Sequence, residues 1–284
     1  MVQQAKTTGG AAVFPKRRYA DLFVSLLVAI FICGGAALAT DEAPECKVCV
    51  SKDSDTLWQI VDSKCLQHLV DHDRYPCLSA AVPEGPQGRY KGYVLLKDLV
   101  GPAQVLLIPT QKISGIESPE ILGGEATNYF AEAWHARSIL DALAHKDLPR
   151  NAISLAINSK CKRSQGQLHI HIDCVRPDVN EALSKQRIGY QWAKLGVPLL
   201  GHDYMAMRVD GDQLGANPFK LLADKLDGAS KNMGERTLVV IGATFENNQN
   251  GFIILESQFD PSTHNLAHGE DLQDHYCSIA WQGK

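Results

Sequence analysis

The stretch Gln165-Gly-Gln-Leu-His-Ile-His-Ile-Asp-Cys174 alternates polar and apolar residues and predicts a β-strand with two unlike faces. Side chains alternate across a strand, so its apolar members share the face that we expect to lie against the core: Leu168, Ile170, Ile172 and Cys174. The opposite face, which we expect to be open, carries five polar residues: Gln165, Gln167, His169, His171 and Asp173. Solvent-facing strand positions usually hold Lys, Glu or Thr, so a His-x-His pair here indicates chemistry.

Two antiparallel hairpins are expected, one on each side of this strand in the sequence. Each is built from two apolar, β-leaning runs: residues 93–96 with 104–109, and residues 237–244 with 252–257. Gly101-Pro102 indicates the turn region of the first hairpin, and Asn250-Gly251 indicates the turn of the second. The hairpins predict an antiparallel sheet.

Helical spacing of apolar residues predicts helices at residues 55–72 and 128–144, and residues 152–158 read as a further strand. Phe130 and Trp134 lie on the second helix and are expected in the core. The predicted fold class is therefore α+β, with helices packed on an antiparallel sheet.

The N-terminal residues have the pattern of an export signal. Lys16-Arg17-Arg18 precedes an apolar stretch at 22–39, which ends in the small-x-small pattern Ala37-Leu38-Ala39. Residues 1–39 are thus expected to be a signal peptide or a membrane-spanning anchor, and residues 40–52 a linker. Either alternative places the rest of the chain outside the cytoplasm. We expect an inner-membrane anchor with the protein facing the periplasm, or a cleaved periplasmic protein.

The overall charge excludes one class of partner. The 284 residues include 28 Lys and Arg against 32 Asp and Glu, a net charge of −4. A nucleic-acid binder that works through a basic surface is therefore not expected. An anionic ligand must be held by a local site, and Lys162 and Arg163 in the loop before the His-x-His strand are candidates.

The polar face of the strand has three alternative interpretations. One imidazole can attack a nucleotide phosphorus and form a nucleotidyl-histidine. Alternatively, His169, His171 and Asp173 can ligate a metal, as in zinc hydrolases. The third alternative is a non-catalytic module that binds a nucleotide or a lipid.

The strand resembles the histidine-triad superfamily, whose pattern is His-φ-His-φ-His-φ-φ in a βαββ-like half-barrel. Further strings resemble the CDP-diacylglycerol pyrophosphatase family: 94–99, 154–159, Arg176-Pro-Asp-Val179 and Gln273-Asp-His275. The similarity covers about residues 53–278. It implies a histidine-triad-like domain at 53–180 and a C-terminal α+β extension at 181–284 packed on it.

The resemblance implies a hydrolase of phospholipid metabolism that splits CDP-diacylglycerol into phosphatidate and CMP. No cofactor or metal is expected, the partners are the substrate and membrane lipid, and the oligomeric state stays open. His169 takes the place of the nucleophile, His171 contacts phosphate, and Gln167 replaces the first histidine of the triad. A shifted register that begins at His169 would make His171 the nucleophile, but the flanking strings favour the first register. Five residues are expected to bind substrate: Asn158, Arg163, Gln165, His202 and Tyr204.

Seven cysteines follow the apolar stretch, and their spacing alone leaves the disulfide connectivity open. The resemblance implies pairs between Cys65 and Cys77 and between Cys174 and Cys277. A pair between Cys46 and Cys49 would then leave Cys161 as a free thiol.

Overall fold

The computed structural model describes residues 54–67 and 75–281. The predicted signal or anchor at 1–39 and the predicted linker up to residue 52 lie outside these residues. Within the described part of the chain, no helix is long and apolar enough to cross a membrane.

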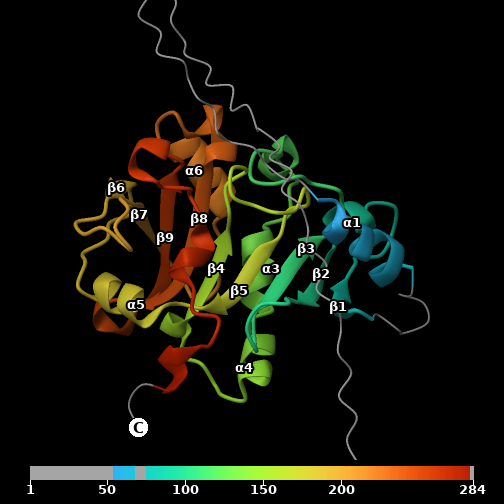
Figure 1. Ribbon diagram of the computed structural model, residues 1–284, viewed down its shortest axis with the longest axis horizontal. Coiled ribbons are helices and arrows are strands. Elements are labelled where there is room, and N and C mark those ends of the chain that lie inside the picture. The colour runs from blue at the N-terminus through green and yellow to red at the C-terminus, as the bar shows by residue number, and fades with distance from the viewer. Residues whose placement is uncertain (1–53, 68–74, 282–284) are drawn as a thin grey trace, which may run out of the picture. The chain divides into compact units, whose positions relative to one another are not determined.

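The core of the fold is a single antiparallel sheet, which confirms the α+β prediction (Figure 1). Among the described residues it has nine strands in the order β1-β2-β3-β5-β4-β8-β9-β7-β6. Their bounds are β1 Cys77–Ala81, β2 Tyr93–Lys97, β3 Val105–Pro109, β4 Ile153–Ile157, β5 Ile170–Cys174, β6 Ala193–Lys194, β7 Met205–Asp210, β8 Arg236–Thr244 and β9 Asn250–Gln258. Strands from residues 53–180 and from residues 181–284 share the sheet, and β4 joins the two sets by pairing with β8.

Both predicted hairpins are present. In the first, Tyr93 pairs with Pro109 at one end and Lys97 pairs with Val105 at the other. The second, formed by β8 and β9, turns at residues 245–249, before the predicted position. Asn250 and Gly251 already pair within the ladder, and a 3₁₀ turn at Glu246–Asn248 reverses the chain. The Asn-Gly turn prediction is therefore wrong.

The helices are shorter than the apolar periodicity predicts. Their bounds are α1 Thr56–Ile60, α2 Gly88–Lys91, α3 Tyr129–His135, α4 Ser138–Ala144, α5 Pro177–Ser184 and α6 Pro218–Lys225, and a π-helical turn at Val61–Cys65 continues α1. The expected helix at 128–144 breaks between α3 and α4. There the Arg137 side chain donates to the Trp134 carbonyl at 2.7 Å and takes the acceptor that the next helical turn would use.

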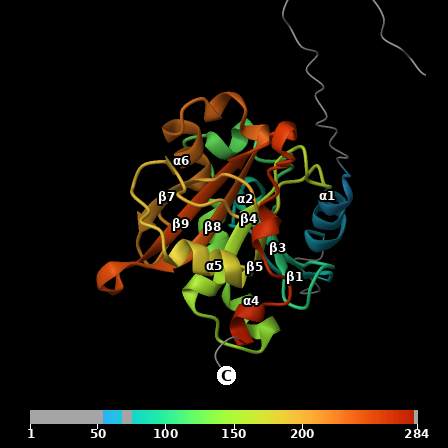
Figure 2. The ribbon, with the colours of Figure 1, turned by 60° about the vertical axis from the view of Figure 1, so that its left-hand side comes forward.

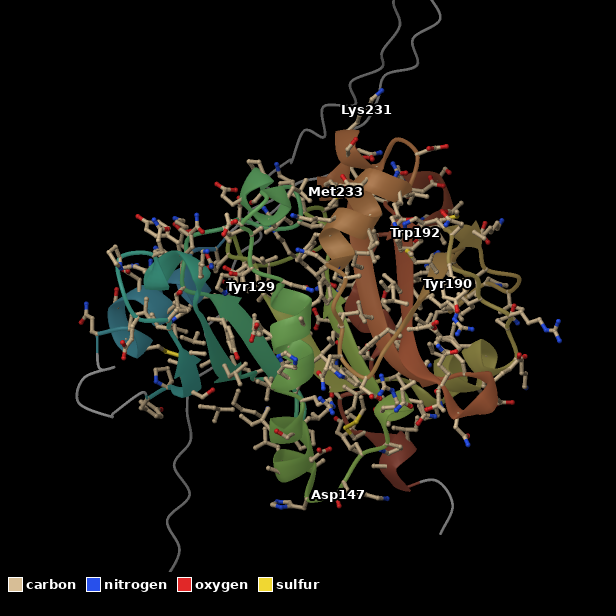
Figure 3. The ribbon with its side chains drawn as sticks, turned by 180° about the vertical axis from the view of Figure 1, so that it is seen from behind. Tyr129, Asp147, Tyr190, Trp192, Lys231 and Met233 are labelled. Atoms are coloured by element: carbon tan, nitrogen blue, oxygen red, sulfur yellow. A yellow bond between two sulfur atoms is a disulfide. The ribbon has the colours of Figure 1, made fainter. Side chains whose placement is uncertain are left out.

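Helices cover both faces of the sheet. Seen from behind in Figure 3, α3 and α6 lie over one face, where Phe130 and Trp134 are fully buried as predicted. The other face has two separate apolar clusters, one beneath α1 and one beneath α5. The C-terminal segment, red in Figures 1 and 2, passes over β4 and β5 on this second face. The division leaves a polar strip between the two clusters.

Candidate active site

Strand β5 separates the apolar core from this polar strip. Ile170 and Ile172 are buried in the core on the side of α3. Three side chains form the strip on the other face: His169, His171 and Asp173. Across the strands, His171 pairs with Leu106 of β3, which belongs to the cluster beneath α1, and with Ala156 of β4, which belongs to the cluster beneath α5. The strip therefore occupies the gap between the two apolar clusters.

The polar strip is covered, so the prediction of an open face is wrong. His169 is 7% exposed and His171 is 4% exposed. The Gln273 side chain of the C-terminal segment donates to the His171 carbonyl at 3.1 Å, and the Asp274 N–H donates to the Cys174 carbonyl at 2.9 Å. Alternation in a strand shows which residues share a face, but it says nothing of a segment one hundred residues later that packs over them.

His169 has one ring nitrogen fixed and the other left for chemistry. Its Nδ1 lies 2.7 Å from the carbonyl oxygen of Gln167. A carbonyl only accepts hydrogen bonds, so Nδ1 carries the proton and Nε2 keeps its lone pair. Burial lowers the pKa of His169 and keeps the ring neutral, although the hydrogen bond to Gln167 opposes the shift. A neutral imidazole with a fixed tautomer is a ready nucleophile.

His171 lies against His169, with 4.8 Å between the ring centroids. Burial lowers the pKa of His171 to about 3, so this ring is neutral as well. Its Nδ1 lies 3.0 Å from the amide nitrogen of Gln104, which therefore donates and leaves the proton on Nε2. Nε2 lies 3.0 Å from a carboxylate oxygen of Glu270, but it is not aligned for a hydrogen bond.

Unsatisfied buried atoms gather around this ring. In the described part of the chain, four buried side-chain atoms lack a hydrogen-bond partner. One of them is His171 Nε2, and two are the amide oxygens of Gln104 and Gln273, whose amide nitrogens bond to His171. Buried polar atoms are normally paired, since an unpaired one costs about 1–3 kcal/mol. The His171 N–H therefore has unused donor capacity directed into the strip.

Glu270 and its neighbours give the site a charged wall. Burial raises the pKa of Glu270, but hydrogen bonds from His268 and Asn158 and the positive charge of His268 outweigh it and lower the pKa well below the ordinary value. The amide of Asn158 donates to Glu270 at 2.5 Å. His268 bonds Asp271 at 2.7 Å. Burial lowers its pKa, but hydrogen bonds to Asp271 and Glu270 raise the pKa to about 9, so His268 is a cation at neutral pH.

A second imidazole–carboxylate pair lies at the other end of the strip. His275 Nδ1 lies 2.6 Å from an oxygen of Asp173, and the other Asp173 oxygen accepts from the Cys174 N–H at 2.8 Å. The hydrogen bond to Asp173 raises the pKa of His275. The disulfide between Cys174 and Cys277 joins β5 to the segment that carries His275. His275 has 27% of its side chain exposed, so this end of the strip reaches solvent.

A model of the family "CDP-diacylglycerol pyrophosphatase" matches residues 52–281 of the chain. The chain is also 39% identical over 230 residues to a CDP-diacylglycerol pyrophosphatase of Yersinia pestis, covering 80% of this chain and 85% of the relative. The chain belongs to the CDP-diacylglycerol pyrophosphatase family. It is a hydrolase that acts on a diphosphate bond.

Gln167, which replaces the first histidine of the triad pattern, is fully buried and holds a loop. Its amide nitrogen donates to the carbonyls of Pro109 and Gln111 at 3.1 and 2.9 Å, and its amide oxygen accepts from the Ile113 N–H at 3.3 Å. Both amide hydrogens are used. The side chain braces residues 109–113, while the backbone carbonyl of Gln167 orients His169.

The other predicted ligands divide into two groups. Asn158 reaches the strip through Glu270, and Arg163 lies near enough to lower the pKa of His169 as one of several influences. The Arg163 guanidinium is bonded at 2.7 Å to both carboxylate oxygens of Glu117. Gln165 instead accepts the Leu57 N–H at 3.2 Å, so it fixes the start of α1.

His202 and Tyr204 lie outside the strip. Tyr204 is 4% exposed and packs in the apolar cluster beneath α5, just before β7. In the sheet order β7 is four strands from β5. At strand spacings near 4.8 Å this is about 19 Å of sheet. Neither residue is among the hydrogen-bond or ion-pair partners of His169 and His171 in the described part of the chain.

The cysteines confirm two predictions and contradict one. Cys65–Cys77 and Cys174–Cys277 are disulfides, as the resemblance implies. Cys161 is disulfide-bonded too, so the prediction of a free thiol is wrong.

The geometry does not favour a metal site on the His-x-His-x-Asp motif. Among the described residues, the group of candidate ligands that meets closely is Asp173, Cys174 and Cys277, and both of its cysteines are used in the disulfide. A disulfide sulfur is not the thiolate that metals bind. His169 and His171 are not part of that group.

Several groups that build the site were not predicted from the motif. They come from the turn after β2 and from the C-terminal segment: Asp98, Gln104, His268, Glu270, Gln273 and His275. The string Gln273-Asp-His275 in the family resemblance was the available signal. A cavity of about 790 Å³ lies at the end of α5 against β8 and β9 and has none of these residues in its lining.

Proposed function

We propose that this chain hydrolyses CDP-diacylglycerol to phosphatidate and CMP through a covalent nucleotidyl-histidine on His169. The observation that carries the proposal is the hydrogen bond from Nδ1 to the Gln167 carbonyl, because it leaves the Nε2 lone pair on a neutral, buried ring. The family supports the substrate, which the name of the Yersinia pestis relative also contains.

The reaction takes two displacements at the α-phosphorus. His169 Nε2 attacks this phosphorus and forms the P–N bond. The bond from the phosphorus to the bridging oxygen breaks, and phosphatidate departs with the electron pair. The ring becomes cationic, and its Nδ1–H bond to the Gln167 carbonyl then strengthens. Water attacks the phosphorus in the second step, the P–N bond breaks, CMP leaves, and the water proton passes to solvent.

The surroundings supply charge stabilisation to the phosphoryl oxygens. The unmatched Nε2–H of His171 is the donor that we assign to a non-bridging oxygen. His268, a cation at neutral pH, compensates the negative Glu270 beside it. Little acid assistance is needed, since the leaving phosphate monoester has a second pKa near ~6. This offsets the absence of a histidine at position 167.

We include the exported location in the proposal. Two disulfides within the described residues are typical of an oxidising compartment. The basic residues followed by an apolar stretch at 22–39 fit an inner-membrane anchor that faces the periplasm. An enzyme held at the bilayer meets a lipid substrate at high effective concentration.

Rapid quenching tests the covalent step. Full-length protein is mixed with CDP-diacylglycerol carrying a cytidine label, quenched in alkali within milliseconds, digested and analysed by mass spectrometry. We expect a CMP adduct on the peptide that contains His169, and none in His169→Ala. His202→Ala is the matched control and should retain the adduct. An adduct on His171, or steady turnover in His169→Ala, would contradict the proposal, and activity abolished by EDTA would favour the metal alternative.

A further inference from the structure

The turn between β2 and β3 presents an apolar tip beside the active site. Leu99 is 101% exposed and Val100 is 47% exposed. Tyr276, in the C-terminal segment, is 77% exposed. Single exposed apolar residues are common on soluble proteins, but three in adjoining segments beside a candidate site call for a partner. We call Leu99, Val100 and Tyr276 the apolar tip.

Backbone packing brings the two parts of the tip together. Gly101 has a φ of +62°, and a Cβ at this position would lie 2.5 Å from the His275 carbonyl oxygen. Only glycine permits this approach, so the turn rests directly on the residue before Tyr276. Figures 1 and 2 both show the red C-terminal segment close to this end of β3.

Hydrogen bonds hold the turn, and Asp98 within it lies near His171 of the polar strip. Lys97 Nζ donates to the carbonyls of Asp98 and Gly101 at 2.7 and 2.8 Å, and one oxygen of Asp98 accepts the Val100 N–H at 3.2 Å. The other oxygen of Asp98 lies 3.7 Å from His171 Nδ1. A turn held in this way keeps its apolar side chains exposed without collapsing onto the protein.

We infer that the apolar tip inserts into the surface of a phospholipid bilayer and thereby delivers the diphosphate of a membrane-embedded substrate to His169. The inference rests on the proposed function, since that substrate carries two acyl chains. The two ends of this substrate match the two ends of the strip. The basic loop with Lys162 and Arg163 precedes the strand at the His169 end. The tip adjoins Asp173 and His275 at the other end. The nucleotide would then face the basic loop and the lipid would face the tip.

The nature of the contact is hydrophobic rather than ionic. The lysine in the turn is engaged by backbone carbonyls, and the nearby Asp274 caps the Tyr276 and Ser278 N–H groups at 3.0 and 2.6 Å. Insertion of apolar side chains depends little on salt, whereas attraction of a basic patch to anionic lipid weakens with it.

The test compares hydrolysis of the same headgroup on a substrate in a bilayer and on a substrate dispersed in water. Wild type, Leu99→Ser/Val100→Ser and the control Leu200→Ser, which alters an exposed leucine in the loop before β7, are assayed as full-length chains. The substrates are long-chain CDP-diacylglycerol in phosphatidylcholine vesicles and dispersed dibutyryl CDP-diacylglycerol. We expect the double variant to lose about tenfold in kcat/KM on vesicles, as fits partial burial of a leucine and a valine, and under about twofold on the dispersed substrate.

Each other outcome overturns the inference. Equal loss on both substrates would make the turn part of the catalytic geometry, and equal loss in Leu200→Ser would indicate a general surface effect. No loss on vesicles would remove the tip as a lipid contact. A polarity-sensitive fluorophore on Leu99→Cys should shift to the blue with substrate-free vesicles, while one on Leu200→Cys should not. This readout needs no turnover, so it separates failure of the inference from failure of the proposed function, which would appear as no CMP from either substrate in wild type.

Discussion

Strands β5 and β8 lie on either side of β4 and both are almost wholly buried, yet only β5 belongs to the candidate active site. On the side of α3 and α6 both contribute to one core. On the opposite face β5 presents His171 and Asp173, and His169 comes directly before the strand. There β8 presents Val239, Ile241 and Ala243 to the cluster beneath α5. Burial alone therefore does not distinguish the strand of the candidate site from a strand of the apolar core.

The difference lies in what covers each strand. Apolar side chains of α5 and Leu272 of the C-terminal segment cover β8 by apolar contact. Loops cover β5 and supply polar partners: the Gln167 carbonyl to His169, the Gln104 amide to His171 and the His275 ring to Asp173. Burying a polar group without a hydrogen-bond partner costs free energy. A buried polar strip is therefore stable only where the loops that cover it supply hydrogen-bond partners. The unpaired atoms around His171 mark the place where the partners are incomplete.

The sharpest way to break the comparison is to remove one side chain from each strand. His169→Ala should lower CMP release by at least about 10³-fold, since it removes the attacking nitrogen, while thermal unfolding stays near wild type. Val239→Ala on β8 should do the opposite: about 1–3 kcal/mol less stability and unchanged kcat/KM. Steady-state kinetics and calorimetry measure both. Turnover retained in His169→Ala, or lost in a folded Val239→Ala, would contradict the division of roles.

The sequence predicts the strand, its two faces and its neighbouring hairpins, because alternation and turn residues act over a few positions. It identifies His169 and His171 as candidates for the same reason. Gln104, Glu270 and His275 carry no local pattern, and they reach β5 through loop closure over long sequence separations. The covering of the strip, and the use of both Gln167 amide hydrogens by a neighbouring loop, are tertiary facts of this kind.

The two disulfides extend the comparison to the covering loops. Cys174–Cys277 closes a separation of 103 residues and Cys65–Cys77 one of 12 residues, so the chain-entropy model gives about 4–5 and about 3 kcal/mol of stability. Replacing Cys174 and Cys277 by Ser should in addition lower kcat about tenfold, because the segment with His275 is released. Replacing Cys65 and Cys77 should spare kcat. Equal kinetic effects would show that the covering segment is held without its disulfide.

Gln167 offers a smaller and more selective test. Gln167→Leu leaves the loop carbonyls of Pro109 and Gln111 without their donor, which should cost about 1–3 kcal/mol in the free energy of unfolding. The backbone carbonyl that orients His169 remains, so kcat should fall by less than about tenfold. Chemical denaturation and CMP release measure the two quantities. A loss of kcat as large as that of His169→Ala would instead return Gln167 to direct contact with the phosphoryl group.

The last test concerns the pH dependence that His268 gives to the covering segment. Its folded pKa, about 9, lies above the ordinary value of 6.5, so the protonated ring stabilises the folded state. This contribution is fully present below about pH 6.5 and is lost as the pH rises through about 9. Above that pH the ring is neutral in both the folded and the unfolded state. The free energy of unfolding of wild type minus that of His268→Gln should therefore be largest at pH 6 and should vanish near pH 10. His264→Gln, on an exposed turn of the same segment, is the control. A difference that stays constant over this range would mean that His268 does not carry its charge in the folded protein, and the cationic partner that we assign to Glu270 would be lost with it.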